Sequence, residues 1–264
     1  MRIRLRRKKK SPAPPDPLLQ LRQEFPDVTA SVLEVVRDVA SYTMTSPARL
    51  VSLCDAVEHV ARNQVPGDVV ECGVWRGGSM MAVARSLVQL HDSSRKLWLY
   101  DTFDGMSEPD DDDVDLTGKA ARHLLDEQSK QDPLSIWCRS PFDEVRRNLE
   151  STGYGLDNMR FVAGKVEETI PASVPEQISL LRLDTDWYES TWHELTHLYP
   201  RLSPGGVLII DDYGHWQGCR RAVDEYFASQ DDSIFLHRID YTGRLAIKPP
   251  GPHEVVSSNL KVAG

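Results

Sequence analysis

The chain has 264 residues, 40% of them apolar and 27% charged, which excludes a fibrous or wholly disordered protein and fits one α/β domain. No segment approaches the roughly 18 consecutive apolar residues of a membrane span, and no apolar stretch follows the basic start MRIRLRRKKK, so we expect a soluble, cytoplasmic protein without membrane insertion. The net charge is −9, and seven of the 31 basic residues lie in the first ten positions. The rest of the chain has 24 basic and 40 acidic residues, so we expect that it binds no nucleic acid.

Four parts follow one another along the chain. Residues 1–18 are basic and proline-rich and predict a flexible arm, although their charge would also suit anionic lipid or RNA. Residues 19–66 carry helical patterns, the last of which is predicted to begin at Pro47 with Ser46 as its N-cap. Residues 67–250 form the main α/β domain, and residues 251–264 form a C-terminal tail.

Short apolar runs alternate with helix-like segments through the main domain. Because strands that alternate with helices form right-handed crossovers, these runs predict a parallel sheet covered by helices on both faces. SIFLHRID and GRLAIKP, on either side of Tyr241 and Thr242, predict a closing hairpin instead. The five predicted parallel strands lie within residues 68–75, 96–103, 159–166, 178–187 and 205–213.

The ends of the first two predicted strands favour a nucleoside-bearing cofactor, because ligands of open α/β sheets bind beyond the carboxyl ends of the strands. The first strand runs into ECGVWRGGS, from Glu71 to Ser79, where small residues let a ligand approach the backbone and free N–H groups favour a carboxylate. The second ends at Asp101, placed to accept both hydroxyls of a ribose. Neither signal is specific alone, since such a turn can be structural and Asp101 can cap a helix or lie in a solvated loop.

Acidic residues end two further predicted strands. LRLDTDWYEST places Asp184 and Asp186 after one apolar run, and GVLIIDDYG places Asp211 and Asp212 after the other. Carboxylates at the end of a hydrophobic strand are costly to desolvate unless a cation meets them. Hard oxygen ligands from two neighbouring strands suit Mg²⁺ or Mn²⁺.

A role without a metal, and a zinc site in place of a magnesium site, are the two alternatives to this interpretation. The acids could cap their strands and pair with Arg182 or Arg220 instead of binding a metal. Zinc is disfavoured, because the histidines and cysteines show no H-E-x-x-H or C-x-x-C spacing. The histidines and cysteines considered as zinc ligands are His193, His197, His215, Cys54, Cys72, Cys138 and Cys219.

Several longer motifs lie in order along the chain: YTMTSPARL, PGDVVECGVWRGGSM, LYDTFDGM, FVAGKVEETIP, LLRLDTDWYEST and LSPGGVLIIDDYGHWQGCRRAVDEYF. With these motifs, nearly all of residues 40–248 resembles the macrocin O-methyltransferase (TylF) family. Members of that family use S-adenosylmethionine and Mg²⁺ to methylate sugar hydroxyls of macrolide and aminocoumarin antibiotics. The resemblance implies a class I methyltransferase (Rossmann-like) α/β fold, with a mostly parallel seven-stranded sheet, a C-terminal β-hairpin and a helical N-terminal lid. It makes residues 67–250 the S-adenosylmethionine-binding catalytic domain.

The resemblance also implies roles for individual residues. The catechol methyltransferases place a lysine base three residues after the first metal aspartate, and this chain has Trp187 there. Asp186 is therefore the implied base, acting beside Asp184 in the catalytic centre, with His215 as an alternative. The implied metal ligands are Asp184, Asp211 and Asp212. The implied cofactor-binding residues are Met44 and Thr45 in the lid, Glu71, Cys72, Gly73 and Ser79 near the methionine part, Asp101 at the ribose, and Val166 and Glu167 beside the adenine.

The implied reaction is methyl transfer to a sugar hydroxyl of a glycosylated natural product such as a macrolide, with the metal lowering the pKa of that hydroxyl. A sugar of a polysaccharide or other glycan is an alternative acceptor. A non-catalytic relative that binds cofactor or sugar is an alternative function, and the missing G-x-G-x-x-G disfavours a nucleotide-dependent oxidoreductase. The resemblance further implies a homo-oligomer, a dimer or larger.

The acidic segment, EPDDDDVD at residues 108–115, follows the second predicted strand. Its run of like charges predicts a solvated, mobile loop at the mouth of the cofactor site. A further hypothesis is that this loop becomes ordered when substrate binds.

Overall fold

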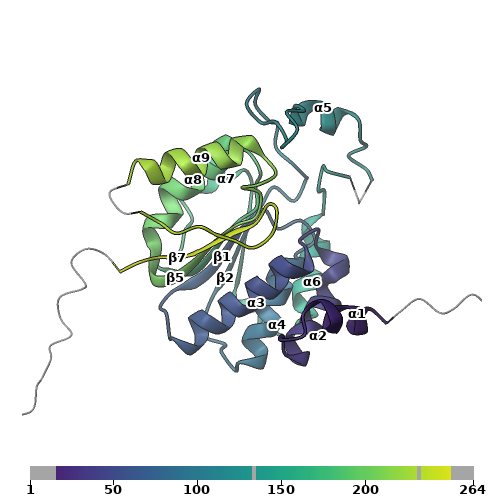
Figure 1. The fold of residues 1–264 in the computed structure, drawn as a ribbon, viewed down its shortest axis with the longest axis vertical. Helices are drawn as coiled ribbons and strands as arrows, with labels where there is room; N and C mark the ends of the chain where they lie inside the picture. The colour runs from purple at the N-terminus through teal and green to yellow at the C-terminus, as the bar shows by residue number, and fades with distance from the viewer. Residues whose placement is uncertain (1–15, 133–134, 231–232, 251–264) are drawn as a thin grey trace, which may run out of the picture.

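The computed structural model describes residues 16–132, 135–230 and 233–250. Within them, seven strands form one sheet in the order β3-β2-β1-β4-β5-β7-β6 (Figure 1). The strands β3 to β5 of that order are parallel, and β7 is antiparallel to both β5 and β6. The predicted α/β sheet with its closing hairpin is thereby confirmed. The strands are β1 (Asp68–Cys72), β2 (Leu97–Asp101), β3 (Met159–Ala163), β4 (Ile178–Leu183), β5 (Leu202–Ile210), β6 (His237–Arg238) and β7 (Arg244–Ile247).

Helices cover both faces of the sheet (Figure 1). Side chains from α1 to α4 and α6 form the core on one face, and those from α5 and α7 to α9 form the core on the other. The helices are α1 (Pro17–Glu24), α2 (Ala30–Val39), α3 (Pro47–Arg62), α4 (Gly78–Gln89), α5 (Ala121–Asp126), α6 (Phe142–Glu150), α7 (Val166–Thr169), α8 (Tyr188–Leu198) and α9 (Gln217–Ala228). Short 3-10 helices span Ala40–Tyr42, Leu156–Asn158 and Tyr199–Arg201.

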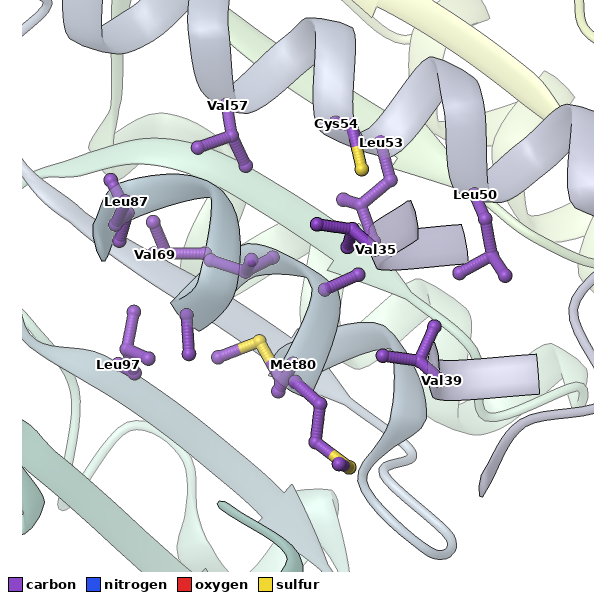
Figure 2. Packing of buried hydrophobic residues seen from close by; sticks show 14 of the residues in the cluster. Val35, Val39, Leu50, Leu53, Cys54, Val57, Val69, Met80, Leu87 and Leu97 are labelled. Atoms are coloured by element: carbon purple, nitrogen blue, oxygen red, sulfur yellow. The ribbon is translucent and has the colours of Figure 1, made fainter. Parts of the chain in front are cut away.

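The central strands are buried on both faces, so they read as continuous apolar runs in the sequence. Successive side chains of a strand point to opposite faces. Val69 of β1 accordingly packs in one core and Val70 in the other, and Leu180 and Leu181 of β4 divide in the same way. Figure 2 shows the first core, where side chains of α2, α3 and α4 meet the sheet at Val69 and Leu97; the helical residues labelled there are Val35, Val39, Leu50, Leu53, Cys54, Val57, Met80 and Leu87.

The N-terminal helical region leads directly into the sheet. α3 begins at Pro47, and the Ser46 hydroxyl accepts a hydrogen bond from the Arg49 backbone N–H at 3.3 Å, as predicted for an N-cap. The preceding helix ends earlier than the sequence pattern suggested, because the last turn tightens into a 3-10 helix at Ala40–Tyr42. Residues 43–46 therefore form a short link before α3, and we call this link the lid segment.

Some boundaries differ from the predictions. Residues 1–15 of the predicted arm and the predicted tail at 251–264 lie outside the described residues, and helix α1 begins at Pro17, two residues before the predicted helical region. β1 ends at Cys72 and β4 at Leu183, so the residues that follow each strand are free to line a site. Within the described part of the chain, no helix combines the length and the hydropathy that a membrane crossing requires.

The acidic segment 108–115 is docked on the protein rather than wholly solvated. Asp113 is 2% exposed, and its carboxylate accepts hydrogen bonds from the backbone N–H groups of Tyr188 and Asp110, both at 2.9 Å. Isolated β-bridges join Val114 to Ala120 and Asp115 to Trp216. The prediction of a solvated loop is therefore wrong at Asp113, because this carboxylate stabilises the first turn of α8. The neighbouring Asp110, Asp111 and Asp112 are exposed, as predicted.

Candidate active site

A cavity of about 350 Å³ lies at the carboxyl ends of the parallel strands. Its volume falls in the range of roughly 300–1,000 Å³ that is typical of small-molecule sites. Turns after β1, β2, β3, β4 and β5 contribute to its wall, together with the lid segment. The predicted site residues that line it are Met44, Thr45, Gly73, Ser79, Asp101, Val166, Glu167, Asp184, Asp186, Asp211 and Asp212.

Two predicted cofactor residues, Glu71 and Cys72, do not line this cavity. Both still belong to β1, so their side chains point into the packed layers beside the sheet and are only 1% and 0% exposed. Burial raises the pKa of Glu71 to about 8 and raises the pKa of the Cys72 thiol. The structure therefore brings Gly73, but neither of these two side chains, to the cavity wall.

The glycine-rich turn after β1 needs glycine at two close approaches. Gly73 has φ +81°, and a Cβ there would overlap the carbonyl oxygen of Asp184. A Cβ at Gly78, the first residue of α4, would lie 2.5 Å from the carbonyl oxygen of Tyr42. Arg76 in the same turn donates a hydrogen bond to the Ser41 carbonyl at 2.8 Å. The turn thus packs directly against β4 and against the residues that precede the lid segment.

Asp101 stands at the end of β2 and holds the glycine-rich turn in place. Its carboxylate accepts hydrogen bonds from the backbone N–H groups of Val74 (2.7 Å), Trp75 (2.9 Å) and Phe103 (2.7 Å). Burial raises the pKa of this carboxyl group. Each carboxylate oxygen can accept more than one hydrogen bond, so Asp101 can still accept hydroxyl donors from a ligand in the cavity.

Three aspartates converge in the cavity, and we call Asp184, Asp186 and Asp212 the carboxylate cluster. One oxygen from each lies within 4.8 Å of the others. Removal from bulk solvent raises the pKa of Asp186 to about 7 and raises those of Asp184 and Asp212 well above the usual range. Asp186 also has φ +72°, a left-handed conformation that is uncommon outside glycine and that is found at functional sites.

Asp211, the fourth predicted acid, is held differently. Its Oδ1 accepts a hydrogen bond from Arg182 at 2.6 Å, and its Oδ2 pairs with Arg49. Consecutive residues after a strand point in different directions, so Asp212 joins the carboxylate cluster while Asp211 meets the arginines. The predicted alternative of arginine pairing thus holds for Asp211 and, through Arg182, for Asp184. Arg220 instead donates to the backbone carbonyls of Tyr213 and Gly214.

Arg182 forms ion pairs with three carboxyl groups. Its Nη1 donates to Glu71 and, at 2.6 Å, to Asp184, and its Nη2 donates to the Thr45 hydroxyl at 2.8 Å as well as to Asp211. The side chain is 3% exposed. One guanidinium therefore connects β1, the acids after β4 and β5, and the lid segment.

The balance of charge in this region fits a divalent cation. Five carboxyl groups stand close together against two guanidinium groups, so negative charge is in excess when the acids ionise. Hard carboxylate oxygens at this spacing are the donor set that Mg²⁺ and Mn²⁺ prefer. The carboxyl groups are Glu71, Asp184, Asp186, Asp211 and Asp212, and the guanidiniums are Arg49 and Arg182.

Among the residues of the cavity wall that the sequence did not single out are Arg49, Cys138 and Tyr241. Arg49 lies in the first turn of α3. The sequence pattern around it predicts a helix but does not indicate that it pairs with Asp211, more than 160 positions away. Tyr241 stands in the turn of the closing hairpin, 59% exposed, with its hydroxyl 3.4 Å from Nδ1 of His215. Burial lowers the pKa of His215, so this imidazole is uncharged over a wider pH range.

Residues 23–246 match the sequence profile described as Macrocin-O-methyltransferase (TylF). The chain belongs to this family. The prediction of an O-methyltransferase is thereby confirmed.

Individual members of the family are similar over most of the chain. The demethyldecarbamoylnovobiocin O-methyltransferase of Streptomyces niveus is 38% identical over 204 residues, which are 77% of this chain and 74% of that protein. The 8-demethyl-8-(2,3-dimethoxy-alpha-L-rhamnosyl)-tetracenomycin-C 4′-O-methyltransferase of Streptomyces olivaceus is 38% identical with the same coverage. The solved structure of the O-methyltransferase NovP superposes with a TM-score of 0.68 at 35% identity and covers 79% of this chain and 83% of its own. The class I methyltransferase fold is confirmed by this likeness.

Proposed function

We propose that the protein transfers the methyl group of S-adenosylmethionine to a sugar hydroxyl of a glycosylated small molecule, such as a macrolide, with the help of Mg²⁺ or Mn²⁺. The observation that carries the proposal is the carboxylate cluster, which opens into the same cavity as the Gly73 turn and Asp101. A shared cavity brings a methyl donor and a hydroxyl acceptor into one orientation. The relatives named for a novobiocin precursor and for a rhamnosyl tetracenomycin support a sugar-bearing acceptor.

The cofactor half of the cavity would be formed by the turns after β1, β2 and β3. Asp101 would accept the ribose hydroxyls, for which its carboxylate is already oriented by three backbone N–H groups. Val166 and Glu167 in the first turn of α7 would lie beside the adenine. Gly73 and Ser79 would border the methionine part, and the lid segment would close over it with Met44 and Thr45.

The acidic half of the cavity would hold the cation and move the proton. Asp184 and Asp212 would bind the cation, and Asp211 would join them where its Oδ2 is released from Arg49. When bound, the cation lowers the pKa of an acceptor hydroxyl and S-adenosylmethionine supplies an electrophilic methyl group. Asp186, with a pKa of about 7, is suited to accept the hydroxyl proton at neutral pH. With its proton taken up by Asp186, the acceptor oxygen would be free to receive the methyl group that the cofactor supplies.

The acceptor would enter past the exposed side chains at the rim of the cavity. Met44 is 53% exposed and Tyr241 is 59% exposed, and both line the cavity together with His215. An apolar and aromatic rim suits a glycosylated aglycone, because sugars and hydrophobic rings pack on aromatic faces. Exposed apolar residues beside a polar cluster mark such a binding surface.

The test is methyl transfer from S-adenosylmethionine to a panel of macrolide and aminocoumarin glycosides, read by mass, with Mg²⁺ and with EDTA. We expect a product that carries one more methyl group on its sugar, and we expect EDTA to abolish it. Methylation of a polysaccharide in place of the small glycosides would contradict the acceptor class. Undiminished product in EDTA would contradict the metal role.

A further inference from the structure

The two arginines that meet Asp211 differ in how firmly they are held. Arg182 is 3% exposed, its terminal nitrogens are engaged by three carboxylates and by Thr45, and it does not line the cavity. Arg49 lines the cavity and pairs with Asp211 through Nη1 alone. Arg182 is therefore fixed by its surroundings, whereas Arg49 depends on fewer contacts.

Arg49 also pairs with a second carboxylate, that of Asp240, which is not one of the five carboxyl groups counted above. Its Nε lies 3.1 Å from Oδ2 of Asp240, in the turn of the closing hairpin, and 3.3 Å from the Ser46 hydroxyl. The Asp240 side chain is itself fixed, because its Oδ1 accepts from the backbone N–H groups of Thr242 (2.9 Å) and Gly243 (2.7 Å). The Arg49 guanidinium can thus leave Asp211 and stay paired with Asp240.

A divalent cation and the Arg49 guanidinium compete for the same negative charge. Asp211 directly precedes Asp212 of the carboxylate cluster, and its Oδ2 is the oxygen that Arg49 occupies. Two positive groups a few ångströms apart in this partly desolvated cavity repel each other strongly. Occupation of the cluster by a divalent cation therefore weakens the Arg49–Asp211 pair.

We propose that Arg49 is a displaceable counter-ion of the metal site. It neutralises Asp211 while the carboxylate cluster holds no cation, and when the cation binds it gives up Asp211 and keeps its pair with Asp240. The inference rests on the metal site of the proposed function. It assigns Arg49 a positioning role, in which the arginine sets the affinity for the cation without touching the reacting atoms.

The proposal predicts opposite effects for two substitutions. Arg49→Met removes the competing charge and releases Asp211, so the affinity for Mn²⁺ should rise about tenfold or more. Asp240→Asn keeps an Oδ1 acceptor for the two backbone N–H groups but removes the alternative carboxylate. Arg49 then stays on Asp211, and the affinity for Mn²⁺ should fall about threefold or more.

The measurement is titration of the full chain with Mn²⁺, with free Mn²⁺ followed by electron paramagnetic resonance. Arg85→Met is the matched control, because it removes the same charge from α4, where Arg85 pairs with Asp38 away from the cavity, and it should leave the affinity unchanged. Arg49→Lys keeps the positive charge and should stay near the parent value. A second readout is the rise in Tm that Mn²⁺ produces, which should be larger for Arg49→Met than for the parent.

Equal or weaker Mn²⁺ binding by Arg49→Met would overturn the proposal. If that variant does not fold, Asp240→Asn decides alone, and unchanged or tighter binding by it would overturn the proposal. Failure of the proposed function looks different: a parent protein that binds no Mn²⁺ and methylates its acceptor in EDTA would remove the metal site itself, and the inference with it.

Discussion

The carboxylate cluster lines the cavity, whereas the acidic segment 108–115 does not. The pKa values of two acids of the segment, Asp112 and Asp115, are shifted in the opposite direction from those of the cluster, while burial raises the pKa of Asp113. In the carboxylate cluster, removal from bulk solvent raises the pKa of each carboxyl group. In the acidic segment 108–115, a hydrogen bond from Arg221 lowers the pKa of exposed Asp112, and one from Thr117 lowers that of Asp115. Desolvation and hydrogen-bond donors, rather than the number of adjacent acids, decide this difference. The longer acidic run in the sequence is therefore not the one that we propose as the reactive group.

The largest expected effect comes from the centre of the carboxylate cluster. Asp212→Ala removes the acid that contacts both Asp184 and Asp186, so we expect loss of Mn²⁺ binding and a fall in kcat of about a thousandfold or more. The fold should survive, because the substitution removes a carboxylate that is costly to desolvate. Steady-state kinetics, Mn²⁺ titration and circular dichroism check this. Wild-type turnover would show that the cluster is not the metal site.

Asp186→Asn separates proton transfer from metal binding within the same cluster. Loss of a general base costs typically about 10²–10⁴-fold in rate, and we expect a fall in kcat of that size. Binding of S-adenosylmethionine and of Mn²⁺ should be retained, as measured by calorimetry, because the amide keeps the shape of the carboxyl group. An unchanged kcat would leave His215 as the candidate base, and His215→Gln is the variant to compare with it.

Asp113 is the buried acidic residue of the acidic segment, and its substitution tests what that burial contributes. Asp113→Ala removes the acceptor for the backbone N–H of Tyr188, so the free energy of unfolding should fall by about 1–3 kcal/mol. Urea denaturation measures it. Asp113→Asn keeps one acceptor oxygen and should lose less. Equal stability of all three proteins would mean that the carboxylate does not support α8.

Asp112 should show the smallest effect. This residue is exposed and pairs with Arg221 at the surface, where ion pairs are screened by solvent. Asp112→Asn should leave both Tm and kcat unchanged. A large loss of kcat without a loss of Tm would support the hypothesis that the acidic segment orders on substrate, and would show that its exposed members act in catalysis.

Much of this arrangement could be predicted, because its signals are local. Apolar runs ending in Gly73, Asp101, Asp184 and Asp211 predicted which residues stand beyond the strands, and all four line the cavity. The N-cap Ser46 followed from the residue type and the proline after it. The seven-stranded order and the ligand assignments came from the resemblance to a family rather than from the residues themselves.

Other parts could not be predicted, because they join segments that are distant in sequence. Arg49 of α3 and Arg182 of β4 meet at Asp211, which follows β5. Glu71 forms an ion pair with Arg182 and does not line the cavity, because β1 continues to Cys72 and Glu71 is still part of the strand. Asp113 is buried because the start of α8 supplies a backbone N–H for it, and a run of four aspartates shows nothing of that partner.

The sequence by itself determined the alternation of strands and helices, the glycine-rich turn and the positions of acids beyond two strands, because each depends on residue type and periodicity over a few neighbours. The tertiary structure decided which acids share the carboxylate cluster, which of them pair with arginines and which stay in solvent. Charge pairing and desolvation are properties of the space around a side chain, and that space is filled here by residues more than a hundred positions apart.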